Sequence, residues 1–261
     1  MYLERLKVDG ISTSPYYVPN GKFNTSEPNS DVQMPNCTMY CYCRAFEASD
    51  AVSPYPIARS TLGFGNAKTW YSLSPLPKGS KIKNGSIAVF DGNSGHVAFV
   101  ERVIDSTHAL ITESQYDKNK NLRNYKYWQK DIIELQVGKA TLDGVGKLLG
   151  FLYLTIDDIR VNRDYNKEQI EITKEMVNVR GTPNGNVIRD GCYAPMGIYN
   201  VISKRKVDGY MWYMLDKANW VREGDWLNYY PVDDFEALKK ENEELKRVLK
   251  EINSLSEVKD G

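Results

Sequence analysis

The sequence predicts a chain of three parts: a region of mixed helix and strand, a small all-β barrel, and a C-terminal coiled-coil helix. Changes in hydrophobic pattern support this division. Apolar residues recur at helical spacing in residues 36–50, and short apolar runs bounded by glycine turns follow within residues 87–115. Residues 170–231 contain more short strand-like runs with many aromatics, and residues 235–252 carry apolar positions spaced by three and four.

The N-terminal region begins with a polar stretch and a predicted helix. Residues 1–35 contain scattered Pro, Asn, Ser and Gly, so loops and short irregular segments are expected there. In residues 36–50, Met39, Cys43 and Phe46 fall on one helical face. Residues 51–80 are rich in Pro, Gly and aromatics and favour no regular element.

The pattern then changes to strands. Four apolar runs predict strands: 87–90, 96–103, 109–115 and 151–155. The first two are joined by residues 91–95, which hold two glycines and an Asn and predict a hairpin turn. Residues 156–169 are charged and polar and are interpreted as a linker, so the first domain is predicted to cover residues 1–155.

The rest of the chain divides again at about residue 232. Residues 170–231 favour a small barrel, with strands at 199–203 and 211–215 on either side of the turn at 207–209. The last segment, residues 232–261, can be written as three heptads whose a and d positions alternate: Phe235, Leu238, Asn242, Leu245, Leu249 and Ile252.

These heptads predict self-association through residues 235–255, with a dimer favoured. Glu241 at g and Lys246 at the following e would form an opposite-charge pair between two parallel helices. A buried Asn242 at an a position would specify a two-stranded register. The alternative is a solvated single helix, although an isolated helix of this length is marginal in water.

Composition excludes several classes of protein. The chain has 261 residues, 41% of them hydrophobic and 26% charged, which is unlike a disordered protein. Lys+Arg and Asp+Glu are both 34, so no basic excess suggests a nucleic-acid partner. No apolar run approaches the roughly 20 residues that span a bilayer, and the first ten residues lack a signal-peptide layout. We therefore expect no membrane insertion and synthesis in the cytoplasm.

The four cysteines favour a nucleophile over a disulfide or a metal site. They are Cys37, Cys41, Cys43 and Cys192. With no signal peptide expected, disulfides are not the default. The cysteines lack the paired spacing of zinc sites, and the only histidines are His96 and His108, so no metal or cofactor is expected. Cys37 alone opens the predicted helix, where the helix N-terminus would stabilise a thiolate.

A base and an orienting group can be placed beside this thiol. His96 opens a predicted strand directly after a glycine turn, and Glu113 and Gln115 point to one face of the next strand. A carboxylate beside the imidazole would fix its tautomer and stabilise its charged form. Other interpretations exist for each residue. A lone Cys is often a small core hydrophobe, a lone His often a surface or core residue, and Glu113 could be a plain strand-end carboxylate.

Three motifs in order resemble the CHAP family (cysteine, histidine-dependent amidohydrolase/peptidase) over roughly residues 30–155. They are Asn36-Cys-Thr-Met-Tyr40 followed by Arg44, Gly85-Ser-Ile-Ala-Val-Phe90 with Gly95-His-Val-Ala-Phe-Val100, and Ile111-Thr-Glu-Ser-Gln-Tyr116. The resemblance implies a papain-like α+β fold, in which a nucleophile helix packs on an antiparallel sheet.

The same resemblance implies roles for the site residues. Cys37 would be the nucleophile, His96 the general base and then acid, and Glu113 the orienting group. Gln115 stands where the family usually has Asn. Some members carry an Asp-rich calcium site before the nucleophile. Here that stretch holds Asp31 as its one Asp, so no metal site is expected.

Residues 170–231 resemble a bacterial Src-homology-3 domain. The segment Met176-Val-Asn-Val-Arg-Gly-Thr-Pro183 is similar to the family's opening signature, and Trp212 with Trp220-Val221 matches its later pattern, with Asn219 in place of a glycine. The resemblance implies cell-wall binding in an aromatic groove, with Tyr210, Trp212 and Trp220 as binding residues and Tyr213 and Trp226 as further candidates. Alternatively, half of these rings fill a small core.

Together these features resemble a bacteriophage endolysin, which would cleave an amide bond of Gram-positive peptidoglycan. The reaction would be that of an N-acetylmuramoyl-L-alanine amidase or a peptide endopeptidase. Such an enzyme would be made in the host cytoplasm without a signal peptide and would reach the wall after membrane breach. Two alternatives remain: a host-encoded wall hydrolase, and a non-catalytic wall-binding or assembly protein whose CHAP domain has decayed.

Overall fold

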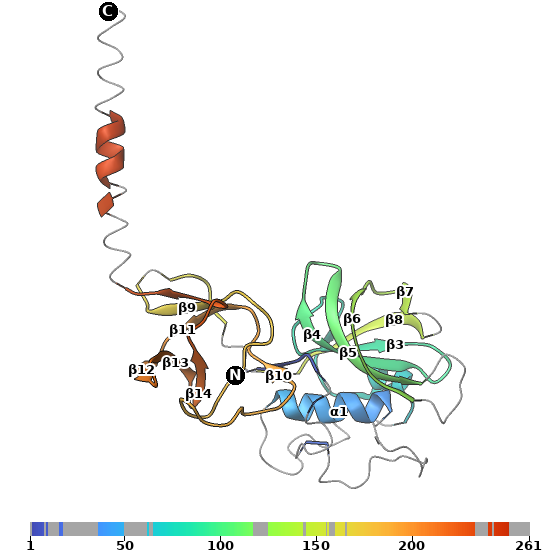
Figure 1. Ribbon diagram of the computed structural model, residues 1–261. Helices are drawn as coiled ribbons and strands as arrows, with labels where there is room; N and C mark the ends of the chain where they lie inside the picture. Colours follow the sequence, from blue (N-terminus) through green and yellow to red (C-terminus); the bar gives the residue numbers. More distant parts are fainter. Residues whose placement is uncertain are drawn as a thin grey trace, which may run out of the picture. The chain divides into compact units, whose positions relative to one another are not determined.

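The computed structural model divides into two compact units, and each is described by itself (Figure 1). The first unit comprises Met1–Asp158 and Val187–Pro195, and the second Ile159–Asn186 and Met196–Gly261. The structure describes residues 2–7, 9, 16–17, 36–49, 62, 65–116, 125–142, 145–154, 156, 160–164, 166–232, 240–241 and 243–250. Residues 187–195 lie within the stretch that the sequence assigns to the barrel, yet they group with the first unit.

An antiparallel sheet forms the centre of the first unit. Its strand order is β2-β8-β3-β4-β5-β6, with β7 paired to β8. The bounds are β2 Lys78–Gly79, β3 Ile87–Phe90, β4 His96–Val103, β5 His108–Tyr116, β6 Tyr125–Glu134, β7 Ala140–Leu142 and β8 Gly146–Leu152. Strands β3, β4 and β5 confirm the runs predicted at 87–90, 96–103 and 109–115. This sheet, together with the helices beside it, agrees with the α+β class.

Alternate residues of the central strands face two hydrophobic clusters. Ile87 and Val89 of β3 belong to a cluster that includes Tyr40 and Cys41 of helix α1 (Cys37–Ala48). Ala88 and Phe90 belong to a second cluster, with strand residues such as Val100 and Ile111. Because both faces are covered, these strands are apolar at nearly every position.

Two helices pack against the sheet. Helix α1 lies against β4 and β5, close to the range predicted from the sequence (Figure 1). Its N-cap is Asn36, whose side-chain oxygen accepts from the Met39 backbone N–H at 3.0 Å. Helix α3 (Ala67–Leu73) lies in the region to which the sequence assigned no element, and it packs through the buried Trp70.

The first unit is completed by a strand pair made from its two ends. β1 (Glu4–Arg5) pairs antiparallel with β10 (Cys192–Tyr193). The sequence predicted only irregular structure in residues 1–35, since β1 has two residues and no periodicity of its own. Leu6 and Tyr193 form a small cluster with Leu110 of β5, which attaches the pair to the sheet.

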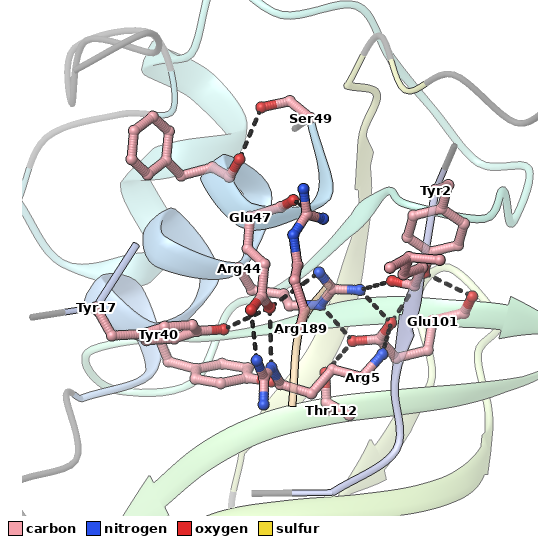
Figure 2. A network of polar contacts seen from close by, with 12 residues as sticks. Tyr2, Arg5, Tyr17, Tyr40, Arg44, Glu47, Ser49, Glu101, Thr112 and Arg189 are labelled. Carbon is pink, nitrogen blue, oxygen red and sulfur yellow. Dashed lines mark hydrogen bonds and ion pairs between the residues drawn. The ribbon is translucent and has the colours of Figure 1, made fainter. Parts of the chain in front are cut away.

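A buried polar network surrounds helix α1 (Figure 2). Arg44 of α1 donates from Nε and Nη2 to the Glu101 carboxylate, each at 2.8 Å, and Arg5 donates from Nε to Glu47 Oε2 at 2.8 Å. Arg44 Nη1 also reaches Glu47 Oε2 at 3.1 Å. Burial raises the pKa of Glu47, but the positive charges of Arg5 and Arg44 outweigh it and hold that pKa at about 2. All four side chains are at most 1% exposed, so each buried charge depends on its partner.

The network joins five segments of the first unit. Tyr2 Oη donates to Glu101 Oε2 at 2.9 Å, and Thr112 Oγ1 of β5 donates to Glu101 Oε1 at 2.7 Å. Arg189, from the segment 187–195, donates to the Glu47 carbonyl oxygen at 2.9 Å. The N-terminal strand, helix α1, strands β4 and β5, and the late segment are therefore held by one set of hydrogen bonds.

The second unit contains two three-stranded antiparallel sheets, ordered β11-β9-β15 and β12-β13-β14. The bounds are β9 Gln169–Ile172, β11 Gly197–Asn200, β12 Ser203–Val207, β13 Tyr210–Asp216, β14 Asn219–Arg222 and β15 Leu227–Tyr230. Asp208 and Gly209 join β12 to β13 with positive φ values of 49° and 85°, as a two-residue hairpin turn requires. The β character predicted for this region is confirmed, and its closure as a barrel stays a prediction.

Little of the predicted coiled coil falls within the described residues. Residues 240–241 and 243–250 are helical where they are described, and Leu245 and Leu249 are 56% and 58% exposed. Phe235, Leu238, Asn242 and Ile252 lie outside the described residues. The heptad interpretation and the dimer therefore stay predictions. Within the described residues, the structure contains no helix that is both long and apolar enough to span a membrane.

Candidate active site

The candidate nucleophile lies where α1 begins. Cys37 is the first residue of the helix, directly after the Asn36 N-cap, and it is half-buried. Cys41, Cys43 and Cys192 are buried, and all four cysteines are free thiols. Burial raises the pKa of the Cys41 and Cys43 thiols well above the ordinary range and that of Cys192 to about 12. Cys37 is thus the thiol best able to ionise.

His96 is placed by the hairpin that the sequence predicted. It is the first residue of β4 and pairs with Phe90 across the turn. Gly95, immediately before it, has φ of 74°, and a Cβ there would lie 2.1 Å from the Lys68 backbone nitrogen. Only glycine fits both conditions, so the turn that directs the imidazole depends on this residue.

A carboxylate holds the imidazole from one side. His96 Nε2 lies 2.5 Å from Glu113 Oε2, and the Glu113 side chain is 1% exposed. Nδ1 is therefore the ring nitrogen left for the hydrogen bond that joins His96 to the Cys37 thiol. The structure brings together the three residues that the sequence proposed as a catalytic set.

Electrostatics favour the charged form of this pair. Burial by itself raises the pKa of Cys37, but the charge and hydrogen bond of His96 and the backbone N–H groups of Val97 and Thr38 outweigh it, so the net pKa is lowered. Burial lowers the pKa of His96, but the Cys37 thiolate and the Glu113 carboxylate outweigh it and raise that pKa to about 10. Both shifts favour a thiolate–imidazolium pair over the neutral pair.

Strand β5 connects this site to the buried network. Thr112 donates to Glu101, and the next residue, Glu113, contacts His96. Glu113 Oε1 is buried and has no hydrogen-bond partner among the described residues. The backbone of Gln115 lies in β5, but its side chain lies outside the described part of the structure, so its role stays a prediction.

Sequence reasoning did not identify the network residues around α1. The motif that resembles the CHAP family includes Arg44, but it assigns no role to Glu47 or Glu101. A signal was present, because Glu101 interrupts an apolar strand and Arg44 and Glu47 lie on a helix with many apolar residues. Charges in such positions are rarely buried unless they are paired.

The aromatic residues proposed for wall binding divide between core and surface. Trp212 and Trp220 are buried, whereas Tyr210 is 46% exposed. A cavity of about 500 Å³ lies in the second unit and is lined in part by Trp212 and Trp226; Tyr210 and Trp220 do not line it. Within the described residues, no group of three or more His, Cys, Asp or Glu is placed to hold a metal ion.

Comparison with known proteins agrees with the first unit's motifs. Residues 27–115 match the profile of the CHAP domain, and this range contains Cys37, His96 and Glu113. A solved structure described as "The crystal structure of Ly7917 with the hydrolyzing product of MDP" is similar at 14% identity and a TM-score of 0.30. The match covers 75% of this chain and 89% of that one. No curated protein matches the chain significantly.

Proposed function

We propose that this protein is a cysteine-dependent hydrolase that cleaves an amide bond in bacterial peptidoglycan. The observation that carries the proposal is the set of Cys37, His96 and Glu113 at the N-terminus of α1, where a lowered thiol pKa accompanies a raised imidazole pKa. The CHAP match over residues 27–115 supports both the chemistry and the substrate class.

The geometry supports a two-step acyl transfer. The Cys37 thiolate attacks the amide carbonyl carbon, and the protonated His96 gives its proton to the departing nitrogen as the C–N bond breaks. This leaves a thioester on Cys37 and a neutral imidazole. His96 then takes a proton from water, whose oxygen attacks the thioester, and Cys37 leaves as a thiolate while the carboxylic acid product is released. Glu113 holds the ring and stabilises its charge throughout.

The finer assignment is part of the proposal. The bond cleaved is that of an N-acetylmuramoyl-L-alanine amidase or a peptide endopeptidase of Gram-positive walls. The second unit would bind the wall, and residues 235–255 would join two chains. A bacteriophage endolysin, made in the host cytoplasm and released by membrane breach, fits these parts best. A host-encoded wall hydrolase is the alternative with the same chemistry.

A non-catalytic wall-binding protein is the alternative from a different class. The intact thiol–imidazole–carboxylate set argues against it, since a decayed site has no reason to keep a low-pKa thiol. The test is the clearing of a Gram-positive wall suspension by the wild type and by Cys37→Ser, with Cys41→Ser as the matched control from the same helix. Mass spectrometry of the fragments would identify the bond. Clearing that persists in Cys37→Ser would overturn the proposal.

A further inference from the structure

The cavity of the second unit is lined by three basic side chains and by one acidic side chain, the exposed Glu175. Its lining includes Arg180 and Arg222, and neither forms an ion pair among the described residues. Lys174 also lines it but pairs with Asp225 at 2.5 Å. The two arginines therefore supply the charge that an incoming anion would meet.

Both guanidinium groups are held against aromatic rings. Arg180 lies over the Trp212 ring at 6.0 Å, and Arg222 lies over the Trp226 ring at 5.7 Å and the Tyr210 ring at 4.3 Å. Trp212 and Arg222 are direct partners in the β13–β14 register. Arg180 also donates from Nη1 to the Gly185 carbonyl oxygen. The ring contacts restrict both guanidinium groups, and their remaining N–H groups suit a planar anion.

Trp212, one of the lining residues, also contains a buried hydrogen-bond donor. Trp212 is 2% exposed, and its indole Nε1 is buried with no acceptor among the described residues. Buried donors are rarely left without a partner, and such exceptions occur where a ligand or water completes the site. Two arginines that form no ion pair among the described residues thus line a single cavity together with Trp212.

We propose that this cavity binds the carboxylate end of a short peptide. A carboxylate matches the planar fork of a guanidinium, and the Trp212 and Trp226 rings provide apolar surface for the adjoining residue. Asn178, Asn184 and the exposed Glu175 complete the lining. Amides suit a peptide backbone, and Glu175 would repel a polyanion, so a peptide is favoured over a phosphate polymer. This inference rests on the proposed wall-binding role and names the group that is recognised.

The test measures binding to the full-length protein by calorimetry. N-acetyl-alanyl-alanine is compared with its C-terminal amide and with inorganic phosphate. The free acid should bind at least about tenfold more tightly than the amide, because a charge-assisted hydrogen bond is lost in the amide. Equal binding of acid and amide, or no binding of the acid, would overturn the proposal. Tighter binding of phosphate would assign the cavity to a phosphate polymer instead.

Substitutions locate the site. Arg180→Gln and Arg222→Gln should each weaken binding of the acid about tenfold or more and leave binding of the amide unchanged. Arg205→Gln is the matched control, because Arg205 lies over the Trp220 ring at 5.9 Å but does not line the cavity. If Arg222→Gln fails to fold, Arg222→Lys should retain the charge and give intermediate affinity. Loss of acid binding in Arg205→Gln alone would contradict the site.

Failure of this inference can be distinguished from failure of the proposed function. Cys37→Ser should bind the peptide acid as tightly as the wild type, whether or not the wild type clears walls. If the wild type clears walls but shows no preference for the acid, the cavity assignment alone is wrong.

Discussion

In the first unit, Arg5 and Arg44 each meet a buried carboxylate, whereas in the second unit Arg180 and Arg222 stack on indole rings and form no ion pair among the described residues. The arginines of the first unit are buried and need a carboxylate partner within the protein, because an unpaired buried charge costs several kcal/mol. The arginines of the second unit line a cavity, where a ligand can match their charge. Arginines paired with buried carboxylates thus stabilise the fold, whereas arginines without such a partner indicate a site for a ligand.

The largest effect is expected at the nucleophile, and it separates the two regions. Cys37→Ser should lower the rate of wall clearing by roughly 10⁴-fold or more, because a hydroxyl is far harder to ionise than the thiol. Binding of the peptide acid by the second unit should not change. Initial rates of turbidity loss and calorimetry measure the two properties independently. Cys41→Ser should keep most of the activity, because the Cys41 thiol is buried and its pKa is raised.

Breaking the matched network should destabilise the protein. Arg44→Met leaves Glu101 and Glu47 without part of their compensating charge and should lower the free energy of unfolding by about 3–5 kcal/mol. Urea denaturation measures this change. Arg222→Gln is the control, and should lower stability by only about 1–2 kcal/mol, because it loses two ring contacts but no ion pair. Equal losses from the two substitutions would remove the distinction between matched and unmatched arginines.

A double substitution sharpens this point. Arg44→Met combined with Glu101→Leu removes both charges of the principal pair and should recover part of the stability lost in Arg44→Met. If the double variant is no more stable than Arg44→Met, Glu101 supports the fold through its other hydrogen bonds, from Tyr2 and Thr112.

The pH profile of wall clearing tests the charge state of the site. The pKa of Cys37 is lowered and that of His96 is raised to about 10, so the thiolate–imidazolium pair exists between the two values. The rate should fall about tenfold per pH unit below the Cys37 pKa, where the thiol is protonated, and again above the His96 pKa, where the imidazole has lost its proton. An acid limb centred at the ordinary thiol value of about 8.5 would contradict the lowered pKa.

The smallest effect concerns the tail. Deletion of residues 233–261 should reduce the mass measured by light scattering about twofold, from a dimer to one chain. Leu245→Ser with Leu249→Ser should act similarly, because both side chains are exposed in a single chain and would be covered in a coiled coil. Glu244→Gln is the control on the same helix. A full-length protein that is already monomeric at micromolar concentration would contradict the heptad interpretation.

Much of the first unit could be predicted because its signals are local. The Asn36 cap, the apolar runs of β3 and β4, and Gly95 each act within a few residues, so the positions of Cys37 and His96 follow from short stretches of sequence. Glu113 could be proposed because strand alternation is regular and the motif resembled that of a known family.

The rest could not be predicted because it depends on contacts between distant residues. Nothing near Arg5 shows that Glu47 will be its partner, and nothing near Arg189 shows that it will reach the end of α1. The cavity has the same origin, since Arg180 and Arg222 are brought together only after β14 has paired with β13 and Arg180 has formed its bridge with Trp220. The spacing of residues along one strand reveals neither the partners in the buried network nor the residues that line the cavity.

The pairing of β1 with β10 has a consequence for synthesis on the ribosome. Glu4 lies opposite Tyr193, so β1 has no partner until residues 1–158 of the first unit and part of the second unit have been translated. Until then Arg5 lacks the late segment beside it, and the carbonyl of Glu47 lacks Arg189. Closing so long a loop is slow relative to forming helices and hairpins. The emerging chain therefore contains Cys37, His96 and Glu113 before it contains β10, so the first unit is completed only late in translation.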